Sequence, residues 1–440
     1  MALTTVVGRR RFLAGGAGVA AGTVLLAACG SPGEDKPAAG AGEQDVDKLV
    51  LLTNADDPTA KPIAEKWNAS NKVKVEVRQT DSSTYSENFP RIATASDAPN
   101  IAGFFIDGGR FTDLAKGGKL LDLTAFWESS GLNANVPDLV KKKYLEFTGD
   151  GKVYGAPTNT SRYGCLFYRK SVLQVAGVTP PKDHVWESEA EWNAACDKLK
   201  AAGIEPISVG GKDGYPLSHL QDGLLSSVMQ PDQINSPLTI DYTSKEWRAP
   251  IEKLVEWNTK GYFSRGFLGR STDQGNTLFG QKKVGFSTGM NVWQPLVVKA
   301  GTPLEDLDWC LLPPIGPLPA KMSVYAGGGV VIPAIAAGHK QALEFMKYLV
   351  SPEAALESAK IGQAVPARTD VPGLVEALGP IGGSMVTFAN QKDRSQFGWD
   401  DPAPTDMITY DRTNLQAVLA GTLTVDAFCG ELEKLKAKKR

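Results

Sequence analysis

The chain has 440 residues, which is too long for one hydrophobic core, because single cores stop growing at about 250–300 residues. Apolar residues make up 42% and charged residues 22% of the chain, so the composition is globular and excludes a disordered chain. The net charge is −2, and no basic block precedes the short tail that starts at Lys434, which argues against nucleic-acid binding. Three histidines are too few for a multi-histidine metal site, and no phosphate loop or dinucleotide motif is present, so we expect neither metal nor cofactor.

The first 28 residues carry the features of a bacterial export signal. Three arginines, Arg9 to Arg11, precede a stretch rich in Gly and Ala, and residues 26–28 (LAA) lead directly to Cys29. The arginines resemble a twin-arginine signal, although Gly8 departs from that pattern and the general secretory route stays open. The end of the segment matches the lipobox of bacterial lipoproteins; the alternative is an ordinary signal with a chance cysteine. We expect acylated Cys29 to hold the protein at the outer face of the cell membrane through a flexible tether, residues 29–44.

Short apolar runs alternate with helical patterns from residue 49 onwards. Strands are expected at 49–52, 73–77 and 101–106, with one helix through Ile63 and Trp67 and another through Phe89 and Ile92. The same alternation continues with an extended stretch at 153–168, strands at 204–209, 284–287, 308–312 and 325–332, and helices at 188–202, 217–229, 247–260, 340–350 and 352–361. This rhythm predicts an α/β fold with mostly parallel sheets flanked by helices, in which ligands bind beyond the strand ends.

The cysteines of the body leave the redox question open. Cys165, Cys196, Cys310 and Cys429 allow three pairings outside the cell. Cys196 shares a helical stripe with Trp192 and Leu199, which equally fits a buried free thiol.

Several segments, in their order along the chain, resemble bacterial extracellular solute-binding proteins of the maltose-binding type. They are residues 117–123 (GGKLLDL), 154–157 (YGAP), 168–170 (YRK), 176–178 (AGV) and 325–333 (YAGGGVVIP). The resemblance implies a two-lobed periplasmic-binding-protein-like fold, with a hinge and a ligand cleft between the lobes. It places lobe 1 at 45–158 plus 329–364, and lobe 2 at 162–326 plus 366–440.

The resemblance also implies a function. Such a protein is a monomeric receptor and not an enzyme; it captures a carbohydrate, most simply an oligosaccharide, and delivers it to the membrane permease of an ABC importer.

Aromatic and polar residues in turns are the candidates for ligand contacts. Sugars offer apolar faces that stack on aromatic rings and hydroxyls that bond to carboxylates, amides and guanidinium groups. Tyr215, Trp293 and Trp399 lie in polar turns, and the resemblance places sugar-stacking aromatics in these regions. The complete set of candidate residues is Asn54, Asp56, Asp57, Asp107, Asn159, Asp213, Tyr215, Asn291, Trp293, Tyr325, Arg394 and Trp399. For Asn54, Asp56 and Asp57, capping of the following helix is an equal alternative.

Two other functions were weighed against a sugar receptor. A receptor for a glycerophosphodiester would need a cation in the cleft, for which Lys212 or Arg394 could serve. Residues 285–289 (GFSTG) fit the nucleophile elbow of a serine hydrolase with Ser287 as nucleophile, followed by Asp306 or Asp308 and then His339. Asn291, Trp293 and Pro295 interrupt the helix that an elbow requires, which disfavours the hydrolase.

The lipobox gives a prediction that fractionation can check. Cys29→Ser should release the protein from the membrane, because the sequence offers no other anchor after residue 30. Immunoblotting of membrane and soluble fractions measures this, with Cys196→Ser as the matched control that should stay membrane-bound. A Cys29→Ser protein that still sediments with membranes would refute the lipoprotein assignment.

Overall fold

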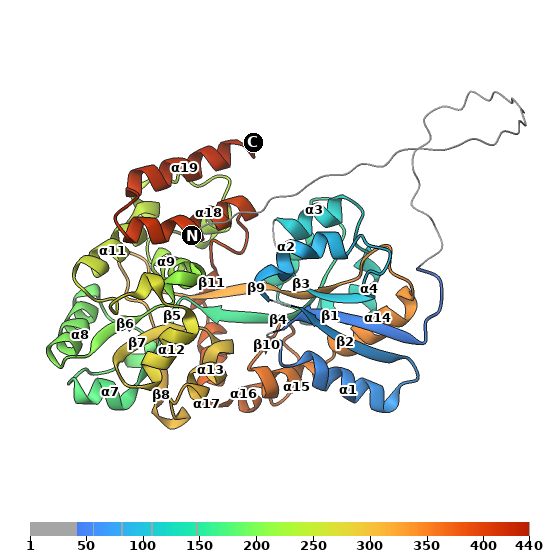
Figure 1. The fold of residues 1–440 in the computed structure, drawn as a ribbon, viewed down its shortest axis with the longest axis horizontal. Coiled ribbons are helices and arrows are strands. Elements are labelled where there is room, and N and C mark those ends of the chain that lie inside the picture. The colour runs from blue at the N-terminus through green and yellow to red at the C-terminus, as the bar shows by residue number, and fades with distance from the viewer. Residues whose placement is uncertain (1–41, 56, 81, 107–108, 147, 440) are drawn as a thin grey trace, which may run out of the picture. The chain divides into compact units, whose positions relative to one another are not determined.

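Two β-sheets organise the chain in the computed structural model, which describes residues 42–439 except 56, 81, 107, 108 and 147 (Figure 1). The expected export signal, Cys29 and nearly all of the tether lie outside the described residues. The strands are β1 (Lys48–Asn54), β2 (Lys74–Thr80), β3 (Ile101–Phe105), β4 (Ala156–Tyr163), β5 (Cys165–Arg169), β6 (Glu205–Ser208), β7 (Val284–Gly289), β8 (Leu307–Leu311), β9 (Met322–Val331), β10 (Val365–Pro366) and β11 (Ser395–Phe397). The first sheet has the order β10-β4-β9-β3-β1-β2, with β11 also paired to β9, and the second has the order β6-β7-β5-β8.

Helices connect these strands and cover both sheets. The α-helices are α1 (Ala60–Ser70), α2 (Ser82–Ile92), α3 (Arg110–Lys116), α4 (Thr124–Ser129), α5 (Leu132–Asn135), α6 (Asp138–Glu146), α7 (Lys170–Val175), α8 (Glu189–Ala201), α9 (Tyr215–Leu225), α10 (Pro231–Ile234), α11 (Lys245–Thr259), α12 (Thr272–Gly280), α13 (Gln294–Lys299), α14 (His339–Leu349), α15 (Pro352–Gly362), α16 (Leu374–Ala377), α17 (Gly379–Ala389), α18 (Thr405–Leu419) and α19 (Val425–Ala437). The 3₁₀ helices are η1 (Lys182–His184), η2 (Gly211–Asp213), η3 (Phe267–Gly269), η4 (Asn291–Trp293) and η5 (Leu304–Asp306). The expected α/β alternation is therefore confirmed.

The strand directions differ from the expectation of mostly parallel sheets. β1 pairs in parallel with β2 and β3, as the β-α-β-α-β rhythm predicts. β9 enters the first sheet antiparallel to β3 and β4, and β5 enters the second sheet antiparallel to both β7 and β8. β5 and β9 each follow a crossing from one sheet to the other, so each enters its new sheet from the opposite end. Strands that are joined by a helical crossover within one sheet run parallel.

Each sheet has its own hydrophobic core. The first core collects residues from β1, α2, β3 and α14, such as Leu49, Phe89 and Phe345. The second sheet is buried on both faces. Alternate residues of β5 divide between them: Leu166 and Tyr168 belong to the cluster on one face, and Cys165 and Phe167 to the cluster on the other.

β4 and β9 lie side by side and connect the two sheets (Figure 1). Their pairing extends from Ala156 opposite Val330 to Tyr163 opposite Ser323. The glycine run in β9 serves this close pairing. A side chain at Gly328 would collide with the amide of Asn159, and one at Gly329 would come within 2.8 Å of the Tyr144 hydroxyl. Gly328 and Gly329 are therefore required for lack of bulk in an ordinary strand, and not for a left-handed conformation.

Asn291 ties the second sheet to the crossing segments. Its Oδ1 accepts from the backbone N of Arg162 in β4 at 2.6 Å, and its Nδ2 donates to the carbonyl O of Gln363 at 2.7 Å. Gln363 ends α15 in a left-handed conformation with φ 54°, which is uncommon for a residue other than glycine. Asn291 is fully buried, and its bond to Arg162 is buried, whereas its bond to half-buried Gln363 is partly buried.

The two hydrogen bonds of the Asn291 side chain, which we call the Asn291 clamp, yield a stability prediction. Asn291→Ala leaves the buried N–H of Arg162 and the partly buried C=O of Gln363 without partners, so the free energy of unfolding should fall by about 1–3 kcal/mol, mainly through the N–H. Denaturant titration measures the change. Asn414→Ala is the control, because Asn414 donates only to Tyr410 within its own helix, and it should change stability by less than about 1 kcal/mol. Equal stability of the two variants would contradict the role of Asn291 as a clamp.

Candidate functional site

Three rings form an aromatic platform at the start of α9. The platform consists of Tyr215, His219 and Trp293, with ring centres 5.6 Å apart for Tyr215–His219 and 6.0 Å for His219–Trp293, whose planes differ by 30°. Tyr215 and His219 are four residues apart on α9 and so share a helix face. Trp293 comes from η4, the turn after β7, and its ring is 5.9 Å from that of Tyr215. Trp293 and His219 are each 8% exposed, and Trp293 belongs to the cluster on one face of the second sheet.

A charged pair stands beside this platform. Arg412 of α18 donates from Nη2 to Oδ2 of Asp400 at 2.7 Å. The backbone brings Arg412 close to Tyr215: a side chain on the preceding Gly214, which has φ 75°, would come within 2.6 Å of the carbonyl O of Arg412. Gly214 is needed there for both its conformation and its lack of bulk.

The protonation states in this region follow from burial and neighbours. Burial lowers the pKa of His219 to about 4, so its imidazole is neutral at pH 7. Burial also works against the charge of Asp400, but Arg412 and the hydrogen bonds that Asp400 accepts hold its pKa below the ordinary value. Burial and the nearby charge of Asp400 raise the pKa of Asp222 well above the ordinary value. The platform is thus uncharged, and the adjacent charge resides on Arg412 and Asp400.

Tyr163 connects the two carboxyl groups of Asp222 and Asp400. Its hydroxyl lies 2.8 Å from Oδ2 of Asp222 and 3.2 Å from Oδ1 of Asp400. One hydroxyl carries one proton and cannot donate fully to both, so a protonated Asp222 completes the arrangement. The Tyr163 ring also packs on His219, with centres 4.4 Å apart, which links the platform to β4.

The first sheet contributes two further aromatic rings, those of Phe105 and Tyr325. Phe105, the last residue of β3, is 38% exposed, and its ring centre lies 6.4 Å from that of Tyr325 in β9. Burial disfavours the charged form of Arg412 and so lowers its pKa. Asp400 and, more weakly, Tyr325 raise that pKa, and the net result is a pKa above the ordinary value. Tyr325 therefore lies between the Arg412 pair and the end of β3.

Two expected ligand contacts are corrected by their burial. Trp399 is 1% exposed and lies in the second core; its Nε1 donates to the hydroxyl of Tyr242 at 2.9 Å, and its ring packs on Trp247 at 5.0 Å. It is a core residue and not a stacking surface. Asn291 spends both ends of its amide on the backbone clamp, so it positions Trp293 and leaves no free amide group for a ligand.

Other expected contacts have structural partners. Asp57 accepts from the backbone N and hydroxyl of Thr59, which realises the capping alternative. Asp213 accepts from the backbone N and hydroxyl of Thr272 at the start of α12. Arg394 lies on the ring of Phe388, 5.2 Å from its centre.

Of the four remaining candidates, two belong to the described residues and two do not. Asp56 and Asp107 lie outside the described residues. Asn54 is half-buried at the end of β1, opposite Thr80 of β2. Asn159 is half-buried in β4, where its amide lies against Gly328.

Sequence reasoning missed three residues of this site: His219, Asp400 and Arg412. Helical spacing from Tyr215 could have found His219, because four residues is one turn. Asp400 and Arg412 carried no local signal; their place beside Tyr215 and His219 depends on how α18 packs on α9.

The residues of the hydrolase alternative lie on different elements: Ser287 on β7, Asp306 on η5 and His339 on α14. Ser287 is buried within β7, which continues to Gly289 before η4 begins, so the serine does not occupy a strand-to-helix elbow. Asp306 bonds to Arg169 and Ser171, and His339 starts α14, which packs in the first core.

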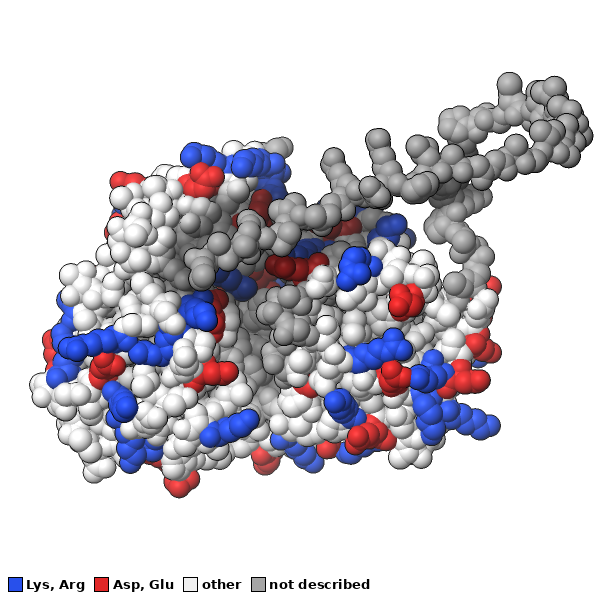
Figure 2. Space-filling view, in the orientation of Figure 1, with Lys and Arg blue, Asp and Glu red and all other residues white. Residues whose placement is uncertain are grey.

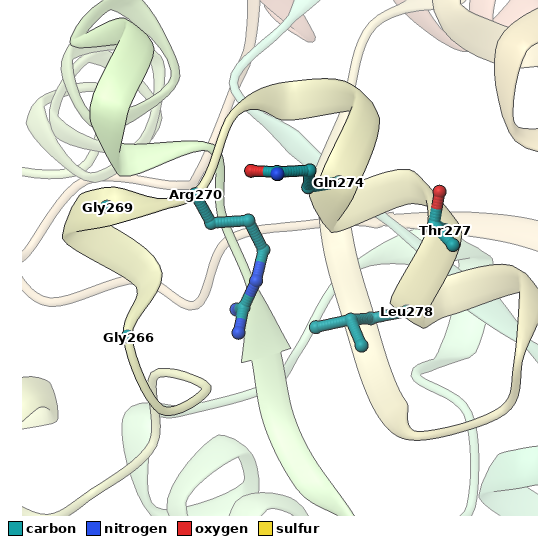
Figure 3. A pocket seen from close by; sticks show the side chains of 6 residues that line it. All are labelled: Gly266, Gly269, Arg270, Gln274, Thr277 and Leu278. Atoms are coloured by element: carbon teal, nitrogen blue, oxygen red, sulfur yellow. The ribbon is translucent and has the colours of Figure 1, made fainter.

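Two surface hollows lie on the second sheet's side of the chain. One, of about 390 Å³, lies between η3 and α12; in Figure 3 Arg270 extends between Gly266 and Leu278. Arg270 already donates to the Ser264 hydroxyl and the Arg265 carbonyl. The other, of about 490 Å³, includes His184 and Asp308. Neither hollow is lined by the aromatic platform.

The described part of the chain contains no cluster of three or more His, Cys, Asp or Glu residues arranged to hold a metal. Its four cysteines are buried free thiols. Among the same residues, no helix has the length and hydropathy of a membrane span. Figure 2 shows positive and negative side chains interspersed on the displayed face, as the small net charge leads one to expect.

The fold agrees with the comparison to known families. The model of the bacterial extracellular solute-binding protein family matches residues 52–356. The chain belongs to this family, and the resemblance drawn from the sequence is confirmed.

Relatives and solved structures agree with this family. An uncharacterised ABC-transporter extracellular-binding protein of Pyrococcus horikoshii is 20% identical over 62% of this chain and 58% of its own length. A chitin oligosaccharide binding protein has a similar fold, with a TM-score of 0.77 at 21% identity over 90% of this chain and 98% of its own. A solute-binding protein in complex with raffinose gives a TM-score of 0.70 at 15% identity over 88% and 99% of the chains.

The burial of Trp399 leads to a prediction about stability. Trp399→Ala should lower the free energy of unfolding by about 3–5 kcal/mol, because it opens a cavity in the core. Trp399→Phe keeps most of the ring and loses the bond to Tyr242, so it should cost clearly less. Thermal or chemical unfolding measures both. A Trp399→Ala protein as stable as the wild type would show that this ring is not part of the core.

Proposed function

We propose that the protein is the solute receptor of an ABC importer and captures a carbohydrate between two lobes. The observation that carries the proposal is the platform of Tyr215, His219 and Trp293 beside the Arg412–Asp400 pair; the rings of His219 and Trp293 are stacked, and that of Tyr215 is tilted against both. Neutral rings offer flat apolar faces to the C–H faces of a sugar, and the charged pair offers both donors and acceptors to its hydroxyls. The solved structures of similar fold with chitin oligosaccharide and raffinose as named ligands support an oligosaccharide.

The proposal includes the division into lobes. Lobe 1 comprises residues 45–158 plus 329–364, and lobe 2 residues 162–326 plus 366–440. The separate cores support this division, because the first-core residues fall in lobe 1, apart from Phe397, and the two clusters around the second sheet fall in lobe 2. Closure of the lobes on β4, β9 and β10 would enclose the sugar. The Phe105–Tyr325 contact then completes the site from the side of lobe 1.

Delivery and location complete the proposed role. The monomeric receptor binds without chemistry and delivers its sugar to the membrane permease of the importer, while lipidated Cys29 holds it at the outer face of the cell membrane. A receptor for a non-sugar solute such as a glycerophosphodiester is the second candidate.

Substitution of Trp293 tests the carbohydrate proposal. Trp293→Ala should weaken binding of the preferred saccharide by about 25-fold or more, which corresponds to about 2 kcal/mol, because a stacking aromatic acts as a binding hot spot. Calorimetry against a panel of neutral mono- and oligosaccharides identifies the ligand and measures the loss.

The control for this test is Trp67→Ala. Trp67 packs on Phe345 and Tyr348 in the first core, so its loss should lower stability and leave saccharide affinity unchanged. If Trp293→Ala binds the saccharide as tightly as the wild type, the platform is not the sugar site. If no saccharide binds and another solute class does, the carbohydrate part of the proposal fails.

A further inference from the structure

A buried ion pair joins the two proposed lobes. Lys143 of α6, in lobe 1, pairs through Nζ with Oδ2 of Asp401, in lobe 2. The side chain of Lys143 is 9% exposed and that of Asp401 is 1% exposed. The ammonium also lies 3.7 Å from the centre of the Phe397 ring. The pair thus connects a helix of lobe 1 to the segment between β11 and α18, outside the crossing strands β4 and β9.

The acids of the candidate site lie close to this pair. Burial lowers the pKa of Lys143, and the charge of Asp401 opposes that effect. Asp400 and Asp222 act more weakly in the same direction as Asp401. These two acids share the hydroxyl of Tyr163 beside the aromatic platform. An ammonium group from lobe 1 therefore lies next to the carboxyl groups that accompany the platform of lobe 2.

A second contact between the proposed lobes lies at the start of α18. A Cβ on Gly109, which directly precedes α3 in lobe 1, would come within 1.5 Å of the hydroxyl O of Thr405 in lobe 2. From Thr405, α18 continues to Arg412, which pairs with Asp400. Both contacts therefore join lobe 1 to the part of lobe 2 that carries the candidate site.

We propose that the Lys143–Asp401 pair is a latch that holds the two lobes together before a solute binds, and that it thereby raises the affinity for the solute. The attraction between two charges is strongest where water is excluded, and the face of the Phe397 ring adds a cation–π contact. Opening of the lobes would break this contact.

The gain in affinity follows from the population of closed receptor. Apparent affinity is reduced by the fraction of molecules that are not competent to bind, so a latch that raises the closed fraction removes part of that loss. Lys143 is then a positioning residue and not a ligand contact. The inference rests on the proposed division into lobes and on capture of a solute between them.

Small-angle X-ray scattering of the purified protein without solute tests the latch. Lys143→Met combined with Asp401→Asn removes both charges, so neither is left buried alone. The radius of gyration of this double variant should exceed that of the wild type, because the lobes spend more time apart. Equal radii would overturn the proposal.

A milder variant keeps the test decisive if the double variant is too unstable to measure. Asp401→Asn alone preserves the shape of the side chain and weakens the attraction to Lys143, so it should give a radius between those of the other two proteins. In that case a radius equal to that of the wild type would overturn the proposal.

Arg169→Met combined with Asp306→Asn is the matched control. This pair is also buried, with Nε of Arg169 2.8 Å from Oδ2 of Asp306, but both residues belong to lobe 2. Its loss should lower the melting temperature and leave the radius of gyration unchanged. Equal expansion of the control and the latch variant would show that lost stability causes the expansion, and the latch would be refuted.

Calorimetry with the panel of neutral mono- and oligosaccharides measures the effect on affinity. Any saccharide that binds the wild type should bind the double latch variant about 10-fold more weakly, because less of the variant is closed. Unchanged affinity would overturn the proposal. If no saccharide binds the wild type, the carbohydrate proposal fails, whereas scattering without solute still decides whether the latch exists.

Discussion

The antiparallel pairing of β4 with β9 is the interaction on which the rest of the structure depends. Each strand belongs to the first sheet and leads directly to or from the second, so their register fixes how the two cores meet. Close approach of Asn159 and Tyr144 requires Gly328 and Gly329 at the centre of this pairing. The ends of the same strands carry Tyr163 and Tyr325, which contact or adjoin the candidate site. Geometry at the crossing and geometry at the site are therefore coupled.

Several polar side chains at this crossing are buried, and they differ in how far their hydrogen bonds and charges are satisfied. Asn291 uses its whole amide on two backbone groups. Lys143 of α6 pairs with Asp401 and lies 3.7 Å from the centre of the Phe397 ring, so a charge from the first core is neutralised by the segment after β11. Arg162 is the contrast, since its charge meets only a hydroxyl. Buried charges cost free energy unless they are paired.

The site combines rigidity with mixed chemistry. Its rings are supplied by a helix start and a turn, both held by backbone contacts, so little side-chain freedom remains to be lost on binding. The neutral imidazole of His219 keeps the platform uncharged next to a full ion pair. Such a surface accepts an apolar face and orients polar groups at its edge, which is what separates one saccharide from another.

The sequence by itself determined the alternation of strands and helices, because hydrophobic periodicity and capping are local. Ser351 caps α15 and accepts from the backbone N of Ala354, as its position before Pro352 predicts. Tyr215 and Trp293 were found for a similar local reason, since both stand in polar turns. Trp399 stands in an equally polar turn, yet it is buried, because Tyr242 and Trp247 cover it from distant parts of the chain. The strand directions and the Asn291 clamp were decided only by the tertiary structure, because each depends on residues that are far apart in sequence.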